Sequence, residues 1–443
     1  MAPVESVTAA RKSGTAAAAP AAARKDVESA ASTAGKPAAS IGATAINLTK
    51  NLIGAGMFTM PKALVHGSVV PGIVMLLFVG TVQGGTFTII AFLCGKLKAK
   101  SYHEIMGKTL GPVAATAVNV CISVNSFFAC TSYLVLVADF FQKALEGLFG
   151  WQDVSRSMLI MVSSIVPLAL SHARNLEPLK YTSMMGLVII ALVFAYVVSH
   201  ALGHPSHAME NLKDHAFRPT LGLFNSLALS TGAFQAHYNA PRIFNEVGGN
   251  LDAHKTTVKL SFGTAFTIYT VFALSGFGIH GKEVHGNVLK SFDPDDVCIL
   301  LAWLGMAFSI IFTFPLVLTT GRDSLIGLLP FLQRASRQQP TATHVAVTTS
   351  MVVTIAGLAC CVEDVSIVTR FLGATVGACL CWIFPASAYI KATASSSPLA
   401  KPLLQKDAPK VTGPAWLKPC AYGMVCVGLL SMAVGLADTF GLL

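Results

Sequence analysis

Long apolar stretches, separated by short polar segments, run through most of this chain. About 20 apolar residues suffice for a helix to cross the hydrocarbon core of a bilayer, and eleven stretches here are roughly that long or longer. They fall near residues 42–66, 69–95, 112–142, 157–173, 180–199, 219–245, 256–278, 297–319, 343–361, 365–390 and 416–440. This pattern predicts an all-α membrane protein with eleven transmembrane helices.

Two of these stretches, the first and the sixth, are interrupted by glycine. The first contains IGAGMFTMP at residues 53–61, and the sixth contains STGAFQAHYN at residues 230–239. Freed backbone N–H and C=O groups find no partner in hydrocarbon, so a break survives only where it is buried or lines a cavity. A matched pair of broken helices in two halves of a chain is typical of secondary transporters. The alternative is that the glycines only allow close helix packing.

Composition supports a membrane protein, and the charge distribution predicts its orientation. Hydrophobic residues make up 53% of the chain and charged residues 12%, whereas soluble domains average about 25% charged residues. If the N-terminus is cytosolic, the inner segments hold 22 of the 31 Lys and Arg residues and the outer segments hold eight, as the positive-inside rule requires. The net charge of +10 therefore reflects topology, and we expect no nucleic-acid partner. An odd number of spans places the C-terminus outside the cell or in a lumen.

The polar segments divide the chain into a tail and one membrane domain. Residues 1–40 are rich in Ala, Ser and Thr, and we expect a disordered cytosolic tail there. Residues 41–443 form the transmembrane domain, in which residues 393–414 are expected to be a polar cytosolic linker before the last helix. The segment Ser101–Pro112 predicts a short helix on the inner face, and a loop is expected around Arg334–Pro340.

Cysteine and histidine patterns predict neither disulfides nor a metal site. The ten cysteines lie in or beside predicted helices, and no outer loop carries a pair that would form a disulfide framework. Cys360 and Cys361 are adjacent, and His200, His204 and His207 have a spacing close to that of zinc ligands. Packing in the bilayer and a solvated loop explain these patterns as well. No catalytic constellation is present, so we do not expect an enzyme.

Three motifs in order resemble those of a known family. NLTKNLIGAGMFTMPKAL resembles the first-helix motif of the amino acid/auxin permeases, FQAHYNAPRIFNEV resembles their sixth-helix motif, and TFPLVLTTGRDSLIGLL resembles the end of their eighth helix. The likeness covers the chain from about residue 41 onward. Membership implies the leucine-transporter-like fold of the APC superfamily, with two inverted five-helix repeats (5+5), discontinuous first and sixth helices and one extra helix. It also implies a secondary active transporter that moves amino acids by alternating access.

The first break supplies backbone groups that suit an amino acid. After the first half-helix ends at Ile53, the free N–H groups of Gly54, Ala55 and Gly56, with the positive end of the following half-helix, suit a carboxylate. Carbonyls at the ends of the two preceding half-helices, near Ser230 in the sixth span, suit an ammonium group. A zwitterionic α-amino acid presents both charges, so we expect these residues to bind it.

Side chains near the breaks predict the substrate class. Phe234 is the main candidate for the wall around the substrate side chain, with Phe312 and Asn125 as further candidates; core packing is the alternative for each aromatic ring. His237 either gates or relays protons, or it packs with a hydrogen bond. Arg322 matches a basic position of the family and has a gating or structural role. No carboxylate lies near either break, so we expect small neutral amino acids.

The coupling ion is the point at which the chain departs from part of the family. Asn47 and Thr313 match positions that hold sodium in sodium-coupled members, but those members have an uncharged residue where this chain has Lys50. Lys50 lies about ten residues into its span, roughly 15 Å deep at 1.5 Å per residue, where the charged form of a side chain is disfavoured. Its ammonium either occupies a cation site or releases a proton in each cycle, and anchoring is the structural alternative. We expect H⁺ rather than Na⁺ as the coupling ion, and no other cofactor.

Two other functions fit the same sequence. One is an amino-acid sensor or transceptor, in which binding signals through the cytosolic tail. The other is a carrier of a related small acid, such as an auxin-like indole or an amino butyrate. We expect a monomer embedded in a lipid bilayer with an amino acid as its ligand. Both a plasma membrane and a vacuolar or lysosomal membrane agree with the pattern.

Overall fold

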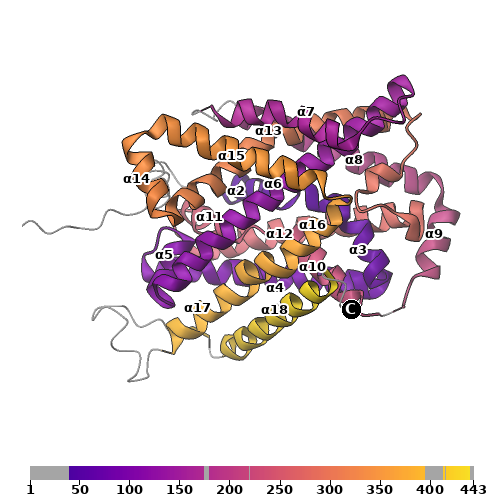
Figure 1. Cartoon of the computed structure of the whole chain (residues 1–443). Helices are drawn as coiled ribbons and strands as arrows, with labels where there is room; N and C mark the ends of the chain where they lie inside the picture. The colour runs from indigo at the N-terminus through magenta and orange to yellow at the C-terminus, as the bar shows by residue number, and fades with distance from the viewer. Residues whose placement is uncertain (1–38, 174–178, 219, 395–412, 415, 440–443) are drawn as a thin grey trace, which may run out of the picture.

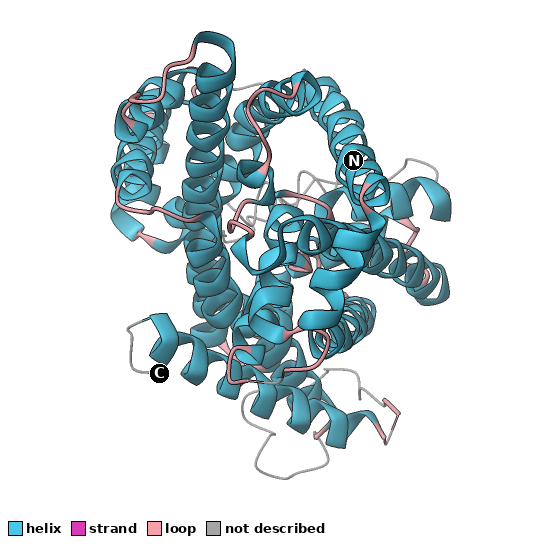
Figure 2. Cartoon of the chain, turned by 90° about the vertical axis from the view of Figure 1, so that its right-hand side faces the viewer, coloured by secondary structure: helices cyan, strands magenta, loops and turns pink. Residues whose placement is uncertain are grey.

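The structure is a computed structural model that describes residues 39–173, 179–218, 220–394, 413–414 and 416–439. Nearly all of the predicted tail and most of the predicted linker lie outside these residues. Within the described ranges the regular structure consists of α-helices with short 3-10 and π segments, and no strand occurs. The helices form one bundle (Figure 1, Figure 2), so the prediction of an all-α protein is confirmed.

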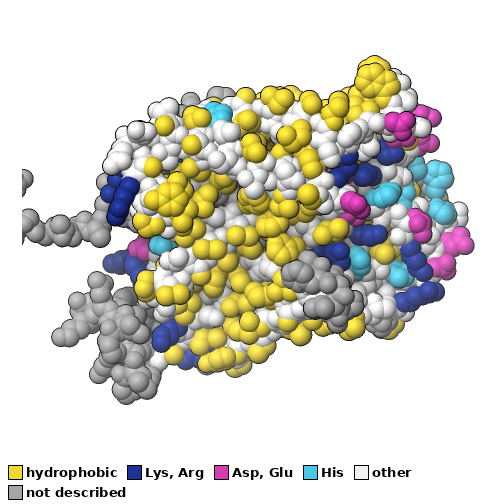
Figure 3. Space-filling view, in the orientation of Figure 1, with side chains coloured by type: hydrophobic (Ala, Val, Ile, Leu, Met, Phe, Trp, Pro, Cys, Tyr) yellow, Lys and Arg dark blue, Asp and Glu magenta, His cyan; other side chains and the backbone are white. Residues whose placement is uncertain are grey.

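Eight apolar helical elements in the described part of the chain are long enough to cross a membrane. They lie in α4 (Val69–Leu97), α6 (Pro112–Phe149), α8 (Leu179–Gly203), α12 (Leu251–His280), α13 (Val297–Leu328), α15 (Pro340–Cys360), the continuous α16 (Val365–Leu372), η5 (Gly373–Ile383) and α17 (Phe384–Thr393), and α18 (Leu417–Thr439). The shorter apolar α7 (Arg156–Ser171) and two interrupted elements occupy the remaining predicted stretches. Hydrophobic side chains cover the middle of the bundle, and charged side chains gather toward its two ends (Figure 3).

The first predicted break is present. Helix α2 (Ile41–Leu52) ends before the extended Gly54, which has φ −134° and ψ −150°. A 3-10 turn, η1 (Ala55–Thr59), then leads into α3 (Met60–Gly67), where Pro61 lies in the first turn. Proline is suited to that position because the first turn of a helix leaves its N–H groups without intrahelical acceptors. The sequence therefore forms two half-helices separated by an unwound segment.

The second predicted break repeats this arrangement. Helix α10 (Leu223–Ala233) ends before Phe234, and a 3-10 turn, η2 (His237–Asn239), leads into α11 (Ala240–Glu246). Pro241 again lies in the first turn of the second half-helix. Both discontinuous helices that the glycines predicted are therefore confirmed.

Side chains from two unbroken helices bind the carbonyls that the breaks leave free. The hydroxyl oxygen of Tyr269 in α12 lies 2.5 Å from the carbonyl oxygen of Leu52 and 3.0 Å from that of Ala233, the last residues of α2 and α10. Gln83 in α4 donates from Nε2 to the Thr231 carbonyl at 3.2 Å. An unpaired buried polar group costs about 1–3 kcal/mol, so these contacts stabilise both breaks in an apolar interior.

The remaining helices are short and lie at the ends of the bundle. Helix α5 (Tyr102–Thr109) is the short helix predicted in the segment Ser101–Pro112, and its N-cap Ser101 accepts a hydrogen bond from the Glu104 N–H. The prediction of a loop around residues 334–340 is wrong in part. Helix α14 (Pro330–Gln338) starts at a proline and occupies most of that segment. The other short elements are α9 (Pro205–Asp214), η3 (Gly281–Glu283) and η4 (Val288–Ser291).

One glycine is required where the tenth predicted span crosses the sixth. A Cβ atom on Gly373, at the start of η5, would overlap the Ala228 carbonyl oxygen of α10. The π-helical η5 therefore lies directly against the first half of the broken sixth helix. Non-α turns of this kind are frequent at functional sites.

A buried carboxylate joins three elements at the end of the bundle that carries α9. Asp139 in α6 is 1% exposed, and its Oδ1 lies 3.1 Å from Nε of Arg156 in α7 and 3.3 Å from Nζ of Lys290 in η4. Arg156 also donates to the Val362 carbonyl after α15. Two cations thus compensate one buried anion, and the loops around this end are tied to α6.

We expect Asp139→Ala to lower the free energy of unfolding by about 3 kcal/mol, because removing one partner of a buried ion pair leaves the other charges uncompensated. Thermal unfolding of the purified protein in detergent would measure the loss. The matched control is Asp295→Ala, since Asp295 is an exposed carboxylate of the same end of the bundle. Equal melting temperatures for the two variants would contradict the prediction.

Candidate functional site

A cavity of about 140 Å³ lies where the two breaks meet. The first break, α6, the second break, α13 and α16 all contribute to its walls. Its lining residues are Asn51, Leu52, Gly54, Gly56, Asn125, Ala129, Ser132, Tyr133, Gly232, Ala233, Gln235, Tyr238, Val317, Thr369 and Leu372. The structure thus brings together Gly54, Gly56 and Asn125, three of the residues that the sequence predicted as substrate ligands.

The first break presents backbone donors to this cavity. No hydrogen bond from the N–H of Gly54 or Gly56 is recorded within the described residues. Gly54 precedes the 3-10 turn that leads into α3, and Gly56 is the second residue of that turn, so both lie at the positive end of a half-helix. Ile53 is buried just before them, and Ala55 is the first residue of η1. Such an array of unpaired N–H groups suits an anion.

The two breaks are in direct contact through one of these glycines. A Cβ atom on Gly56 would lie 3.0 Å from Cα and 3.1 Å from Cβ of Ala233, at the end of α10. Real Cβ contacts are rarely this close, so a larger residue would force the half-helices apart. The absence of a side chain at this position therefore lets the two unwound segments share one cavity.

The second break adds a side chain that the sequence analysis missed. The Nε2 atom of Gln235 is buried without a hydrogen-bond partner among the described residues, and Gln235 lines the cavity. A buried amide N–H without a partner is costly, so this donor is suited to a ligand. The Ser230 hydroxyl is also buried without a recorded partner, but Ser230 does not line the cavity.

Phe234 does not form the predicted wall of the cavity. Its ring is fully buried on the other side of the unwound segment, stacked on Phe262 at 5.8 Å and edge-on to Tyr269 at 5.1 Å between ring centroids. A Cβ on Gly80 of α4 would lie 3.0 Å from the same ring. The unwound backbone turns successive side chains to opposite sides, so Gln235 takes the place that we expected for Phe234.

The other walls are neutral and carry both polar and apolar side chains. Helix α6 contributes Asn125, Ser132 and Tyr133, η2 contributes Tyr238, and α16 contributes Thr369. None of the described residues that line the cavity carries a charge. The site therefore has donors and acceptors for a polar ligand but no counter-charge for a charged side chain.

Two other predicted residues, Phe312 and His237, do not line the cavity. Phe312 of α13 packs against Phe308 with ring centroids 4.5 Å apart. The Nε2 atom of His237 lies 2.9 Å from the Thr86 hydroxyl of α4, on the far side of the broken helix. These contacts favour the packing alternatives for both residues.

Arg322 favours its structural role. It is buried in α13, and its guanidinium donates to the Thr348 hydroxyl of α15 at 3.2 Å and lies 3.5 Å from a carboxylate oxygen of Asp323. The guanidinium thereby cross-links the eighth and ninth predicted spans near one end of the bundle.

Two of the predicted coupling residues make hydrogen bonds to other parts of the protein. Asn47 donates from Nδ2 to Oε2 of Glu246 at 3.3 Å, at the end of α11. The Thr313 hydroxyl donates to the Ser309 carbonyl of its own helix at 2.8 Å. Lys50 lies partly exposed near the end of α2 and does not line the cavity. The two predicted sodium ligands therefore have separate protein partners.

Known proteins resemble this chain over most of its length. Residues 37–440 match the family described as "Transmembrane amino acid transporter protein". Vacuolar amino acid transporter 2 of Saccharomyces cerevisiae is 23% identical over 77% of this chain and 74% of its own length. Vacuolar amino acid transporter 5 of Schizosaccharomyces pombe is 22% identical over 80% of this chain and 86% of its own. Human solute carrier family 38 member 8 is 26% identical over 66% of this chain and 69% of its own.

Solved structures resemble the chain in fold. The manganese transporter of Eremococcus coleocola superimposes with a TM-score of 0.53 at 11% identity, covering 91% of this chain and 88% of that one. MhsT in complex with L-phenylalanine superimposes with a TM-score of 0.51 at 12% identity, covering 89% and 98%. These similarities support the leucine-transporter-like fold. The chain is a multi-pass membrane protein, it is not an enzyme, and it belongs to the transmembrane amino acid transporter family, the amino acid/auxin permeases that its motifs resemble.

Proposed function

We propose that this protein is a secondary active transporter that moves small neutral amino acids across a membrane by alternating access. The observation that carries the proposal is the cavity between the two breaks, which is small, polar and without a charged lining residue. A zwitterionic ligand needs partners for two opposite charges, and a neutral side chain needs none. Backbone groups supply both partners here.

The proposed binding mode assigns each end of the amino acid to one set of backbone groups. The carboxylate accepts hydrogen bonds from the N–H groups of Gly54 and Gly56, supported by the half-helix that begins at η1. The ammonium group donates to the carbonyls of Leu52 and Ala233, each of which has a second lone pair beside the contact with Tyr269. Gln235 donates its free amide N–H to the ligand.

The side chain of the amino acid then points toward α6 and α16. Asn125 and Thr369 lie on that side of the cavity. A volume of about 140 Å³ leaves little room beyond the backbone of the ligand, so a small side chain fits and a large one does not. This supports small neutral substrates over indole-like acids.

Alternating access rests on the two broken helices. The eleven spans form two inverted five-helix repeats and one extra helix, and rocking of one repeat against the other exposes the cavity to each side in turn. The Asn47–Glu246 hydrogen bond joins α2 to α11. This bond must break when the cavity opens to the cytosol. The names of the yeast relatives support a vacuolar membrane, with the N-terminus in the cytosol and the C-terminus in the lumen.

Proton coupling is part of this proposal. Lys50 lies in the same half-helix as Asn47, and a neighbouring positive charge disfavours binding of a second cation. Asn47 donates its amide N–H to Glu246, and the Thr313 hydroxyl donates to Ser309, so both side chains have protein partners in the absence of an ion.

We expect Gly56→Val to reduce amino-acid uptake by on the order of 100-fold, because overpacking costs up to about 3 kcal/mol and the added methyl groups meet Ala233. Uptake by proteoliposomes would measure it, with protein yield and a monodisperse elution profile as the folding check. Gly423→Val is the matched control, since a Cβ on Gly423 of α18 meets nothing within 4 Å. If the Gly56→Val protein transports at the wild-type rate, the two breaks do not form the binding site.

Gln235→Ala should raise the half-saturation concentration for a neutral amino acid by about tenfold, since one hydrogen bond to a charged ligand contributes about 1.5 kcal/mol or more. The maximal rate should change less. Gln338→Ala, at an exposed position of α14, is the control. An unchanged half-saturation concentration would show that the Gln235 amide does not contact the substrate.

Lys50→Ala should abolish the dependence of uptake on an imposed proton gradient if the lysine carries the proton. If the ammonium only stands in for a bound cation, the same change should slow transport or create a sodium requirement. Lys391→Ala, at the exposed end of α17, controls for loss of one positive charge. Wild-type uptake that strictly needs sodium and ignores pH would contradict proton coupling.

A further inference from the structure

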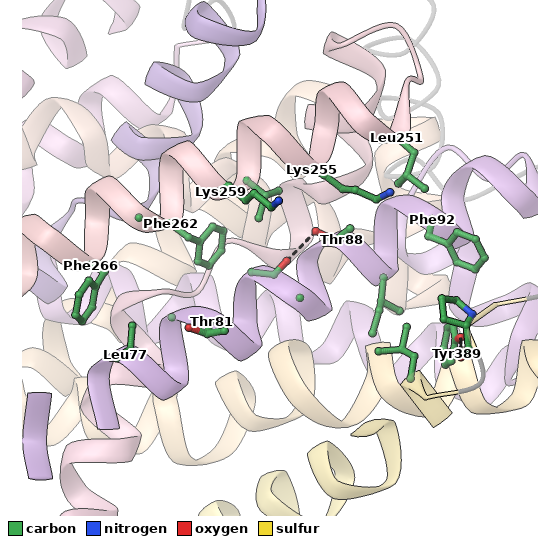
Figure 4. Close-up of a pocket in the computed structure, with 18 of the residues that line it drawn as sticks. Leu77, Thr81, Thr88, Phe92, Leu251, Lys255, Lys259, Phe262, Phe266 and Tyr389 are labelled. Carbon is green, nitrogen blue, oxygen red and sulfur yellow. Dashed lines mark hydrogen bonds between the residues drawn. The ribbon is translucent and has the colours of Figure 1, made fainter. Parts of the chain in front are cut away.

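A second and larger cavity, of about 780 Å³, opens between α4 and α12 and extends to α17 and the start of α18. We refer to it as the α4–α12 groove. Among the described lining residues it shares none with the cavity between the breaks. Figure 4 shows its side chains, most of which come from the facing sides of α4 and α12.

The groove is charged at one end and apolar at the other. Lys255 and Lys259 lie one turn apart on α12, and Phe262 and Phe266 continue the same face of that helix (Figure 4). On the opposite side, Leu77 of α4 lies at the apolar end. A groove with this gradient matches an amphiphile that has one polar head and long apolar chains.

The charged end of the groove lies at the cytosolic side of the bundle in the proposed topology. The N–H of Ala39, where the described chain begins, donates to the Glu246 carbonyl at 2.9 Å, only a few residues before α12 starts. Trp416 and Tyr389 line the same end, and such residues are enriched at membrane interfaces. Lysine side chains of a helix lean toward its N-terminus, so both ammonium groups are directed toward the cytosolic headgroup layer.

These two lysines retain positive charge for a ligand. Lys255 lies 2.9 Å from Asp252, whose side chain is 89% exposed to solvent, and an exposed pair of this kind is weak. Lys259 is exposed and makes no ion pair with any residue that the structure describes. The basic end therefore complements an anionic group, which the cytosolic leaflet supplies in its acidic phospholipids.

The floor of the groove has room for acyl chains. A Cβ atom placed on Gly85 of α4 or on Gly263 of α12 would meet nothing within 4 Å. Both residues lie within helices and line the groove, so their missing side chains leave open space beside the apolar wall.

We propose that the α4–α12 groove binds one anionic glycerophospholipid of the cytosolic leaflet. Its phosphate and acidic headgroup contact Lys255 and Lys259, and its acyl chains lie along Phe262, Phe266 and Leu77 over the two glycines.

The test uses the purified full-length protein in detergent, titrated separately with phosphatidylserine and phosphatidylcholine that carry identical acyl chains, and native mass spectrometry counts the bound lipids. Phosphatidylserine should bind with higher affinity than phosphatidylcholine. Lys259→Gln should weaken phosphatidylserine binding by about five-fold, the contribution of one basic residue near an anionic surface. The double change Lys255→Gln with Lys259→Gln should abolish the preference, whereas Arg337→Gln on α14 should leave it intact.

A second variant tests the acyl-chain part of the site without changing its charge. Gly263→Leu should fill the open floor and weaken binding of both lipids, whereas Gly357→Leu, at a helical glycine of α15 with nothing within 4 Å of its Cβ, should not. Equal affinity for the two lipids in the wild type would overturn the proposal. So would binding that Gly263→Leu blocks but the lysine changes do not alter, because a neutral lipid would then occupy the groove. Binding of neither lipid would also overturn the proposal, because another part of the chain would then fill the groove.

Discussion

Hydrogen bonding of interrupted backbone inside an apolar bundle is the constraint on which this structure depends. Each break ends one half-helix and starts another, and the freed carbonyls and N–H groups are separated from bulk water by the surrounding spans. The Tyr269 hydroxyl contacts the last carbonyl of both first halves, and Gln83 binds a third carbonyl. The N–H groups on the other side of the first break have no such partner in the described structure. The protein thus gives each of these carbonyls one internal donor and leaves the N–H groups of the first break without an internal acceptor.

The segment boundaries and the two breaks could be predicted from sequence because they follow from length, apolarity and the positions of glycine. The glycines in IGAGMFTMP and STGAFQAHYN predicted both interruptions. The structure adds that a proline, Pro61 or Pro241, lies in the first turn of each second half-helix. The order of the motifs also predicted the fold. Helix α14 differs from the expected loop because a proline at its start initiates a helix, which hydropathy does not register.

The side chains that face the cavity were harder to predict. Within a regular helix the period of 3.6 residues assigns faces, but no period applies to Phe234 and Gln235, which lie where α10 unwinds. Phe234 was expected at the ligand, and the backbone turns it toward α4 and α12 instead. Gln235, the next residue of the same motif, lines the cavity. The hydrogen bond of Asn47 to Glu246 likewise depends on a tertiary contact between residues far apart in the sequence.

Phe234 lies between two spaces that have different linings. On one side of its backbone lies the cavity between the breaks, which Ala233 and Gln235 line, and on the other side Gly80 and Phe262 face the α4–α12 groove while contacting its ring. The partition between a polar, ligand-sized space and an apolar, membrane-facing one is therefore a single residue thick. A change of volume at residue 234 is therefore expected to alter both compartments together. Under the proposed function, one aromatic ring would then link the binding of solute in the cavity to the binding of lipid in the groove.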